Sequence, residues 1–149
     1  MRNGLSVVEL VIVGCIIGIL AALVVPHVQT QATDAKTVAA KDNLRVLRST
    51  IELYAANHRG VPPGYENDNR NGALDETYFD DQTVVQERYM RRVPENPFNN
   101  LRTIRMIGNN EPFPTEATGK HGWIYQPATQ TIRLDWPGVD DGGVRYFDF

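Results

Sequence analysis

The sequence predicts an α+β protein in which one long N-terminal helix, kinked at Pro26, packs through its second half on a small antiparallel sheet. Residues 5–25 are almost continuously apolar, apolar residues then recur at helical spacing to about His58, and short β-branched segments follow only after residue 100. A chain of 149 residues with a net charge of −3 has room for one domain of ordinary size and an appendage. Its single cysteine, Cys15, excludes an intramolecular disulfide.

The first element, residues 5–25, has the length and composition of a transmembrane helix. It contains only two clearly polar side chains, Ser6 and Glu9, and a helix of this length extends about 31 Å, close to the hydrocarbon thickness of a bilayer. Glu9 needs an explanation, because a carboxylate in hydrocarbon costs about 3 kcal/mol on insertion scales. Three interpretations are a cleaved secretory signal, a plain anchor, and a segment whose carboxylate has a cationic partner in its working state. Only the third accounts for Glu9.

The same residues carry a family resemblance. Gly4 is followed by LSVVEL and a long apolar segment that contains Gly18. Pro26 stands seventeen residues after Glu9. This pattern resembles the class III signal of type IV pilins and type II secretion pseudopilins, in which Gly and F-T-L-I-E-L precede a helix with Pro at that distance from the Glu. The resemblance implies a pilin-like fold.

The resemblance also implies processing near the N-terminus. A membrane prepilin peptidase would remove a leader of residues 1–4 by cutting between Gly4 and Leu5, and Leu5 would then be N-methylated. The chain departs from the usual pattern at Leu5 and Ser6, where the family has Phe and Thr. Both replacements are mild, so cleavage and methylation are still expected.

Cleavage would create a cationic amine on Leu5, and this amine is a suitable partner for Glu9. In a filament, Glu9 of one subunit pairs with the Leu5 amine of its neighbour. Because an unpaired charge in a low dielectric is costly, the pair acts as a register device. The alternative is that Glu9 extends to the lipid headgroups. Gly14 and Gly18 also have two interpretations, close approach of another helix or a softening of this one.

The charges that flank the apolar segment predict its orientation. Arg2 and the amino terminus precede it, whereas the nine residues after Pro26 contain no Lys or Arg, so the positive-inside rule places the N-terminus in the cytoplasm. With the resemblance, this implies a single-pass protein of the bacterial inner membrane that is extracted into a filament. The expected organisation is a leader (1–4), a transmembrane and assembly helix (5–25), and a periplasmic pilin-like domain (26–149) made of an amphipathic helix (26–59), a loop with a short helix (60–100) and a sheet (101–149).

The helical pattern continues beyond Pro26. Apolar residues recur mostly three or four positions apart, as on a helix that packs one face on a small domain. They are Val28, Ala32, Ala35, Val38, Ala39, Leu44, Leu47, Ile51 and Tyr54. Gly60 suits a left-handed position after the last turn, and Pro62 and Pro63 forbid continuation. The helix is therefore predicted to end near His58.

Residues 61–79 are dense in Pro, Gly, Asn and Asp and predict a loop. DDQTVVQERYMRR then fits a short helix with Asp80 or Asp81 as its N-cap, ended by Pro94. YMRRVPENPFNN resembles the segment that precedes the sheet in the major, G-type pseudopilins of type II secretion, which often read Y-L-x-x-L-P-x-D-P-W-G-N. Three positions depart from that pattern, namely Asn96, Phe98 and Asn99.

Strand signals begin after residue 100. LRTIRMI (101–107) contains β-branched residues, and GWIYQP and TIRLDW flank a turn at 128–130, which predicts a hairpin. VRYFDF (144–149) closes the sheet or forms a tail strand. A three- or four-stranded antiparallel sheet on the second half of the helix would bury Ile104, Ile124, Ile132, Leu134 and Trp136. Trp123 and Tyr125 would then face outward, wholly or in part.

The composition argues against catalysis and against nucleic-acid binding. The only serines are Ser6 and Ser49, no cysteine follows Pro26, and the three histidines are isolated, so no enzyme is expected. RYMRR with Arg102 and Arg105 is a basic, aromatic pattern. However, the residues after Pro26 carry 14 Lys and Arg against 17 Asp and Glu, which does not attract phosphates overall. No nucleic acid is expected as a partner.

The favoured function is that of a structural pseudopilin, which polymerises through its N-terminal helix into a periplasmic pseudopilus for type II protein secretion. One alternative is a type IV pilus or competence pilin, but the chain lacks the C-terminal cysteine pair of disulfide-closed major pilins. The other is a membrane-anchored binding domain without an assembly role. The partners that the resemblance implies are copies of the chain, other pseudopilins, the prepilin peptidase and an inner-membrane assembly platform.

Calcium is the one cofactor that the resemblance implies, since major type II pseudopilins bind it in a loop near the C-terminus. Here DWPGVDDGG places Asp135, Asp140 and Asp141 among flexible glycines. Calcium prefers six to eight oxygen ligands, so these carboxylates are its candidate ligands. The match to the family loop is one of composition only, and turns use the same residues.

Overall fold

The computed structural model describes residues 7–149, and the side chains of residues 21–31 lie outside this description. The helices are α1 (Val7–Asn57), α2 (Glu76–Asp80), a π-helical turn η2 (Asp81–Gln86) and three 3₁₀ turns, η1 (Glu66–Asp68), η3 (Pro127–Thr129) and η4 (Tyr146–Asp148). The strands are β1 (Ile104–Met106), β2 (Trp123–Gln126) and β3 (Thr131–Leu134). The chain divides into two compact units, Met1–Ala35 and Lys36–Phe149, and the division falls within α1. The α+β class predicted from the sequence is confirmed.

Helix α1 confirms the prediction of one long helix. It runs from Val7 to Asn57 and continues through Pro26 without separating into two helices. The predicted kink at Pro26 stays a prediction. At the other end the chain leaves the helix through Arg59 and Gly60, which have φ angles of 56° and 82°. The Gly60 N–H donates to the Ala55 oxygen at 2.8 Å, so Gly60 takes the predicted left-handed position.

The second half of α1 supplies one side of the hydrophobic core of residues 36–149. Its buried face carries apolar residues three or four positions apart, namely Ala40, Leu44, Leu47, Ile51 and Tyr54. The predicted face started further toward the N-terminus and included Val38, which is 60% exposed. The prediction is wrong for Val38, because among the described side chains of α1 the buried face begins at Ala40.

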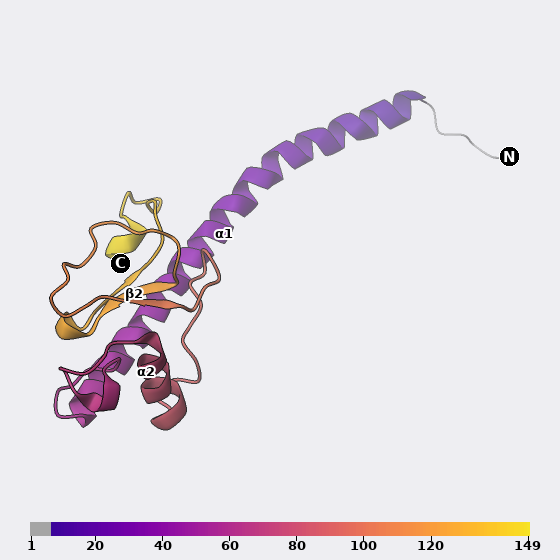
Figure 1. The fold of residues 1–149 in the computed structure, drawn as a ribbon. Helices are drawn as coiled ribbons and strands as arrows, with labels where there is room; N and C mark the ends of the chain where they lie inside the picture. Colours follow the sequence, from indigo (N-terminus) through magenta and orange to yellow (C-terminus); the bar gives the residue numbers. More distant parts are fainter. Residues whose placement is uncertain (1–6) are drawn as a thin grey trace. The chain divides into compact units, whose positions relative to one another are not determined.

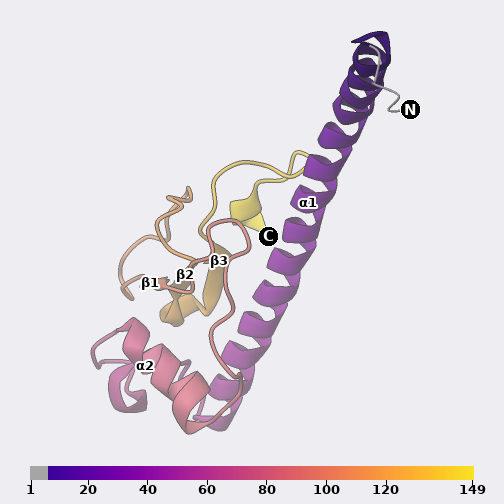
Figure 2. The same ribbon diagram turned by 90° about the vertical axis from the view of Figure 1, so that its right-hand side faces the viewer.

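The sheet has the order β1-β2-β3 and is mixed. Its three strands are labelled in Figure 2. β2 and β3 form the predicted antiparallel hairpin, with Tyr125 opposite Ile132. β1 pairs with β2 in parallel, with Ile104 opposite Trp123. The prediction of a fully antiparallel sheet is therefore wrong for the pair of β1 and β2. Residues 107–122 between the two strands are long enough to return the chain to the starting edge, as a parallel connection requires.

Both faces of the sheet are covered, and this corrects the prediction for β2. Trp123 and Tyr125 were predicted to face outward, but both are buried against α1 together with Ile132 and Leu134. On the opposite face, Ile124 packs with residues from outside the sheet, namely Ile107, Phe147, Phe113 and Ala117. Residues 107–117 and the C-terminal segment thus form a third layer. Trp136 is only half-buried.

Two shorter elements also differ from the prediction. The short helix α2 begins earlier than Asp80 or Asp81, because Asp75 is its N-cap and accepts a hydrogen bond from the Thr77 N–H at 2.7 Å. The last residues neither close the sheet nor form a tail strand. They form the turn η4, which lies at the C-terminus in Figure 1.

Candidate functional site

The N-terminal part of α1 has an apolar surface that is exposed in the described part of the chain. Every residue from Val7 to Leu20 is exposed. Ten of these are large apolar side chains, namely Val7, Val8, Leu10, Val11, Ile12, Val13, Ile16, Ile17, Ile19 and Leu20. A helix that is apolar on all sides needs surroundings that exclude water, and exposed apolar areas of this size mark interaction sites. This segment is therefore the candidate functional site.

Two glycines in this segment leave open space around the helix. A Cβ atom built on Gly14 or on Gly18 would meet no atom of the described residues within 4 Å, apart from the adjacent backbone of α1 itself. Packing among the described residues therefore does not require glycine at either position. Close approach of a second helix and softening of this one both remain consistent with that geometry.

Glu9 lies in the first turn of α1 and is exposed. An acidic side chain is favourable there because it faces the positive end of the helix dipole. Gly4 and Leu5 lie outside the described residues, so cleavage, methylation and the Glu9–Leu5 pair stay predictions. Among the residues that the structure describes, no helix is both long enough and apolar enough to cross a membrane.

Residues 89–100 (YMRRVPENPFNN), which resemble the segment before the sheet in G-type pseudopilins, form a structural brace that holds the start of β2 by side-chain hydrogen bonds. The buried Asn96 side chain donates to the Gly122 oxygen at 3.1 Å and accepts from the Phe98 N–H at 2.9 Å. Asn99 donates to the main chain of residues 119–121 at 3.2 and 2.8 Å. The Trp123 indole N–H donates to the Pro94 oxygen at 2.9 Å. These contacts join the segment to the start of β2.

Asp135 directly follows β3 and is fully buried. Its carboxylate accepts hydrogen bonds from the Thr118 N–H at 2.5 Å and hydroxyl at 2.8 Å, and from the N–H groups of Gly119 and His121 at 3.0 and 2.9 Å. Burial raises the pKa of the Asp135 carboxyl, but the hydrogen bonds from these residues outweigh it and hold the pKa below its usual range. Asp135 therefore organises the turn at 118–121.

Asp140 is engaged within its own turn. Its Oδ1 accepts from the N–H groups of Gly142 and Val144, both at 2.9 Å, and its Oδ2 lies 3.7 Å from the Lys41 ammonium of α1. Asp141 is exposed. The same region of α1 holds the last residue, because Lys41 also lies over the Phe149 ring, 4.1 Å from its centroid.

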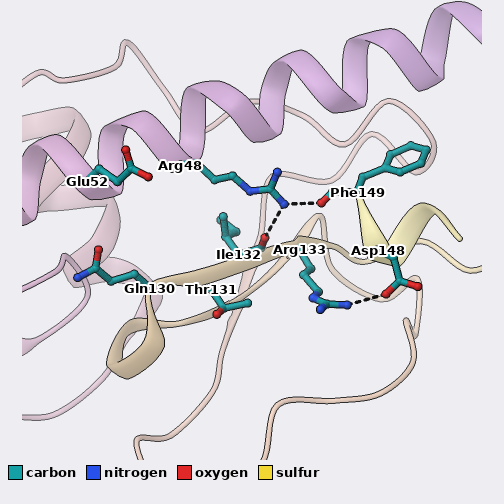
Figure 3. Close-up of a pocket in the computed structure, with 8 residues that line it drawn as sticks. All are labelled: Arg48, Glu52, Gln130, Thr131, Ile132, Arg133, Asp148 and Phe149. Atoms are coloured by element: carbon teal, nitrogen blue, oxygen red, sulfur yellow. Dashed lines mark hydrogen bonds and ion pairs between the residues drawn. The ribbon is translucent and has the colours of Figure 1, made fainter. Parts of the chain in front are cut away.

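Two arginines that the sequence did not single out meet at a cleft between α1, β3 and the C-terminal segment (Figure 3). Arg48 extends from α1 and donates to the main-chain oxygens of Ile132 and Phe149. Arg133 extends from β3 and donates to Asp148 at 2.6 Å. No local sequence pattern predicts this pair, because the two arginines come together only when β3 packs on α1.

Two curated relatives match most of the chain. The type II secretion system core protein G of Pseudomonas aeruginosa is 24% identical over 121 residues, which are 81% of this chain and 85% of the relative. The protein of the same name from Dickeya chrysanthemi is 25% identical over 97 residues, which are 65% of this chain and 63% of the relative. The predicted resemblance to G-type pseudopilins is confirmed. No protein-family model and no solved structure matches the chain.

The relatedness to G-type pseudopilins agrees with the prediction that this chain is not an enzyme, since both relatives are named as components of a secretion system. Two arginines of the basic pattern have acidic neighbours. Arg102 pairs with Glu95, and Arg105 lies 3.5 Å from Glu111. The charges of these two arginines are therefore compensated within residues 36–149.

The calcium site that the resemblance to G-type pseudopilins implies does not fit the three candidate residues. Both oxygens of Asp135 are engaged by four donors of the 118–121 turn, and Asp140 Oδ1 is engaged by two main-chain N–H groups. Among the side chains that the structure describes, which leave out residues 1–6 and 21–31, no group of three or more His, Cys, Asp or Glu is arranged to hold a metal ion. Asp135 is a structural carboxylate rather than a free ligand.

Proposed function

We propose that this chain is a structural subunit that polymerises through its N-terminal helix into a pseudopilus for type II secretion. The observation that carries the proposal is the uncovered apolar surface of Val7–Leu20. The burial of such a surface drives association strongly, at about 25 cal/mol per Å² of apolar area. The relatives named as type II secretion core proteins support this choice of system.

We further propose that residues 5–25 cross the bacterial inner membrane before assembly, with residues 26–149 in the periplasm. The support is the length and composition of the segment and the charges that flank it. Removal of the leader by a prepilin peptidase and N-methylation of Leu5 belong to the same proposal. Other pseudopilins and an inner-membrane assembly platform are the remaining partners.

Glu9 gives the polymer its register in this proposal. The new amine on Leu5 of one subunit meets the Glu9 carboxylate of the next, and the pairing offsets the cost of removing both charges from water. Breaking such a pair by removing one member costs about 3–5 kcal/mol when the site is buried. A subunit inserted out of register leaves both charges unpaired, so the correct register is selected.

The experiment that tests the function is a comparison of Glu9→Gln with wild type in bacterial membranes. The amide inserts more easily than the carboxylate, so membrane extraction and processing should be unchanged, as read by the mass of the mature chain. Crosslinking with an amine-reactive reagent should give a ladder of multimers for wild type and a greatly reduced ladder for Glu9→Gln. Asp34→Asn is the matched control, since it removes one exposed charge of α1 outside the apolar segment.

Several results would contradict the proposal. A wild-type ladder from Glu9→Gln would remove the charge pair from the assembly mechanism. Absence of any ladder from wild type, with intact membrane insertion, would favour a membrane-anchored domain without an assembly role. Normal mature protein from Gly4→Leu would contradict the proposed processing, because the peptidase must seat a small residue beside the scissile bond.

A further inference from the structure

The sheet leaves one strand edge open in the described part of the chain. β3 pairs with β2 and with no other strand among residues 7–149. Successive residues of a strand direct their main-chain groups to opposite edges. The Tyr125 oxygen accepts a hydrogen bond from the Ile107 N–H at 2.8 Å. The main-chain groups of Tyr125 therefore point toward β1, and they make no hydrogen bonds to Ile132, the residue opposite on β3. The N–H and C=O groups of Ile132 therefore point to the open edge.

A cleft of about 310 Å³ runs along this edge. Its walls are α1, which contributes Arg48 and Glu52, and the C-terminal segment, which contributes Asp148 and Phe149. Figure 3 shows Arg48 extended from α1 across the edge to the Ile132 oxygen, at 3.4 Å. This contact is long for a hydrogen bond. Ile132 is buried, and the Arg48 side chain lies against its main-chain oxygen.

The cleft is lined by two arginines, Arg48 and Arg133, and by two acidic residues, Glu52 and Asp148. Asp148 is shared by two arginines, Arg133 and Arg145, which contact its two oxygens at 2.6 Å each. Arg48 donates only to main-chain oxygens in the described part of the chain, and Glu52 supplies one negative charge on the α1 wall. Burial, and then the positive charge of Arg133, lower the pKa of Arg48. An added carboxylate would offset the repulsion between the two guanidinium groups.

We propose that the open edge of β3 docks an extended segment of another protein chain that carries a carboxylate side chain. The main chain of the segment pairs with the N–H and C=O of Ile132, as in strand addition to a sheet edge. Its carboxylate takes the place between Arg48 and Arg133, and Arg48 exchanges its long contact with Ile132 for a charge-assisted one. The site lies in residues 36–149 and does not depend on polymerisation through the N-terminal helix.

The test uses the full chain in detergent micelles and two blocked pentapeptides, Thr-Val-Glu-Val-Thr and Thr-Val-Gln-Val-Thr. Binding is measured by fluorescence anisotropy, and hydrogen exchange of the Ile132 amide is measured by NMR. The Glu peptide should bind and slow exchange at Ile132. The Gln peptide should bind at least about tenfold more weakly, as expected for the loss of one charge-assisted contact. Because the peptides differ and the protein does not, no variant has to fold for this comparison.

Variants then locate the site. Arg133→Gln and Arg48→Gln should each weaken the Glu peptide about tenfold and should reduce its preference over the Gln peptide. Arg45→Gln is the matched control, since Arg45 lies on the same helix with its side chain 82% exposed and pairs with Asp42 outside the cleft. Equal affinity for the two peptides, or no slowing at Ile132, would overturn the proposal. Protection of Ile132 by sodium acetate alone would also overturn it, because the site would then select a small anion.

Discussion

Thr118 donates two hydrogen bonds to the carboxylate of Asp135, one from its main-chain N–H and one from its hydroxyl. The two residues are 17 positions apart, and the contact joins the turn before β2 to the residue that follows β3. With Gly119 and His121 as further donors, the carboxylate satisfies four polar groups at one buried point. Such a network stabilises a fold strongly when complete and is costly when one member is removed.

Asp135→Asn should therefore lower the free energy of unfolding by about 2–3 kcal/mol at pH 7, because hydrogen bonds to a charged acceptor are lost and an amide N–H₂ faces N–H donors. Urea unfolding followed by circular dichroism measures the change. Asp141→Asn is the matched control, since Asp141 is exposed, and it should stay within about 0.5 kcal/mol of wild type. Equal loss in both variants would mean that the carboxylate network has no special role.

The pH dependence of stability should carry the signature of Asp135. Its pKa is lowered in the folded chain, so its contribution is fully present above the unfolded value of about 3.9 and is lost as the pH falls through the lower folded value. The gap in stability between wild type and Asp135→Asn should be constant from pH 7 to 5 and shrink below pH 4. Urea titrations at each pH measure it, and a gap that persists unchanged at pH 2.5 would contradict this account.

We expect Asn96→Asp, which introduces the aspartate of the G-type pseudopilin pattern, to destabilise the fold. Asn96→Asp keeps the acceptor for the Phe98 N–H but replaces the donor to the Gly122 oxygen with a buried charge. The expected loss is about 1–3 kcal/mol of unfolding free energy. Asn110→Asp makes the same chemical change at an exposed position and should be nearly neutral. A stable Asn96→Asp variant would show that the brace adapts to either side chain.

Alanine at Gly14 and Gly18 separates the two interpretations of these glycines. Apart from the adjacent backbone of α1, each added Cβ meets no atom of the described residues within 4 Å, and alanine favours a helix by about 1 kcal/mol over glycine. The double variant should keep its helix content in micelles, measured by circular dichroism. Multimer crosslinking should fall severalfold if neighbouring helices approach closely there, which is the result we expect. Crosslinking at the wild-type level would favour the softening interpretation.

Calcium should leave the thermal unfolding midpoint unchanged. The carboxylate of Asp135 is engaged by four donors and Asp140 Oδ1 by two, so few oxygens remain for a cation that requires six to eight. Calorimetry in millimolar calcium and in equal magnesium provides the comparison. A rise with calcium alone that disappears in Asp140→Ala with Asp141→Ala would instead establish the loop as a calcium site.

Local sequence signals were sufficient to predict the long helix and the position where it ends. Apolar spacing predicted α1, and Gly60 with the two prolines after it predicted where the helix ends. The hairpin of β2 and β3 was equally local, because its β-branched segments flank one short turn. The N-terminal motif was also readable without the fold, since it consists of residue types at fixed distances along one helix.

Tertiary structure alone decided which faces are buried and which polar groups meet. Trp123 and Tyr125 are buried against α1, and residues 107–117 cover Ile124 on the opposite face of β2. Because both faces of this strand are covered, no alternation of apolar and polar residues reveals its orientation. The parallel pairing of β1, the role of Asp135 in the 118–121 turn and the meeting of Arg48 with Arg133 arise between segments far apart in sequence. Local propensity is determined by neighbours along the chain, whereas these contacts depend on how the long connections pack.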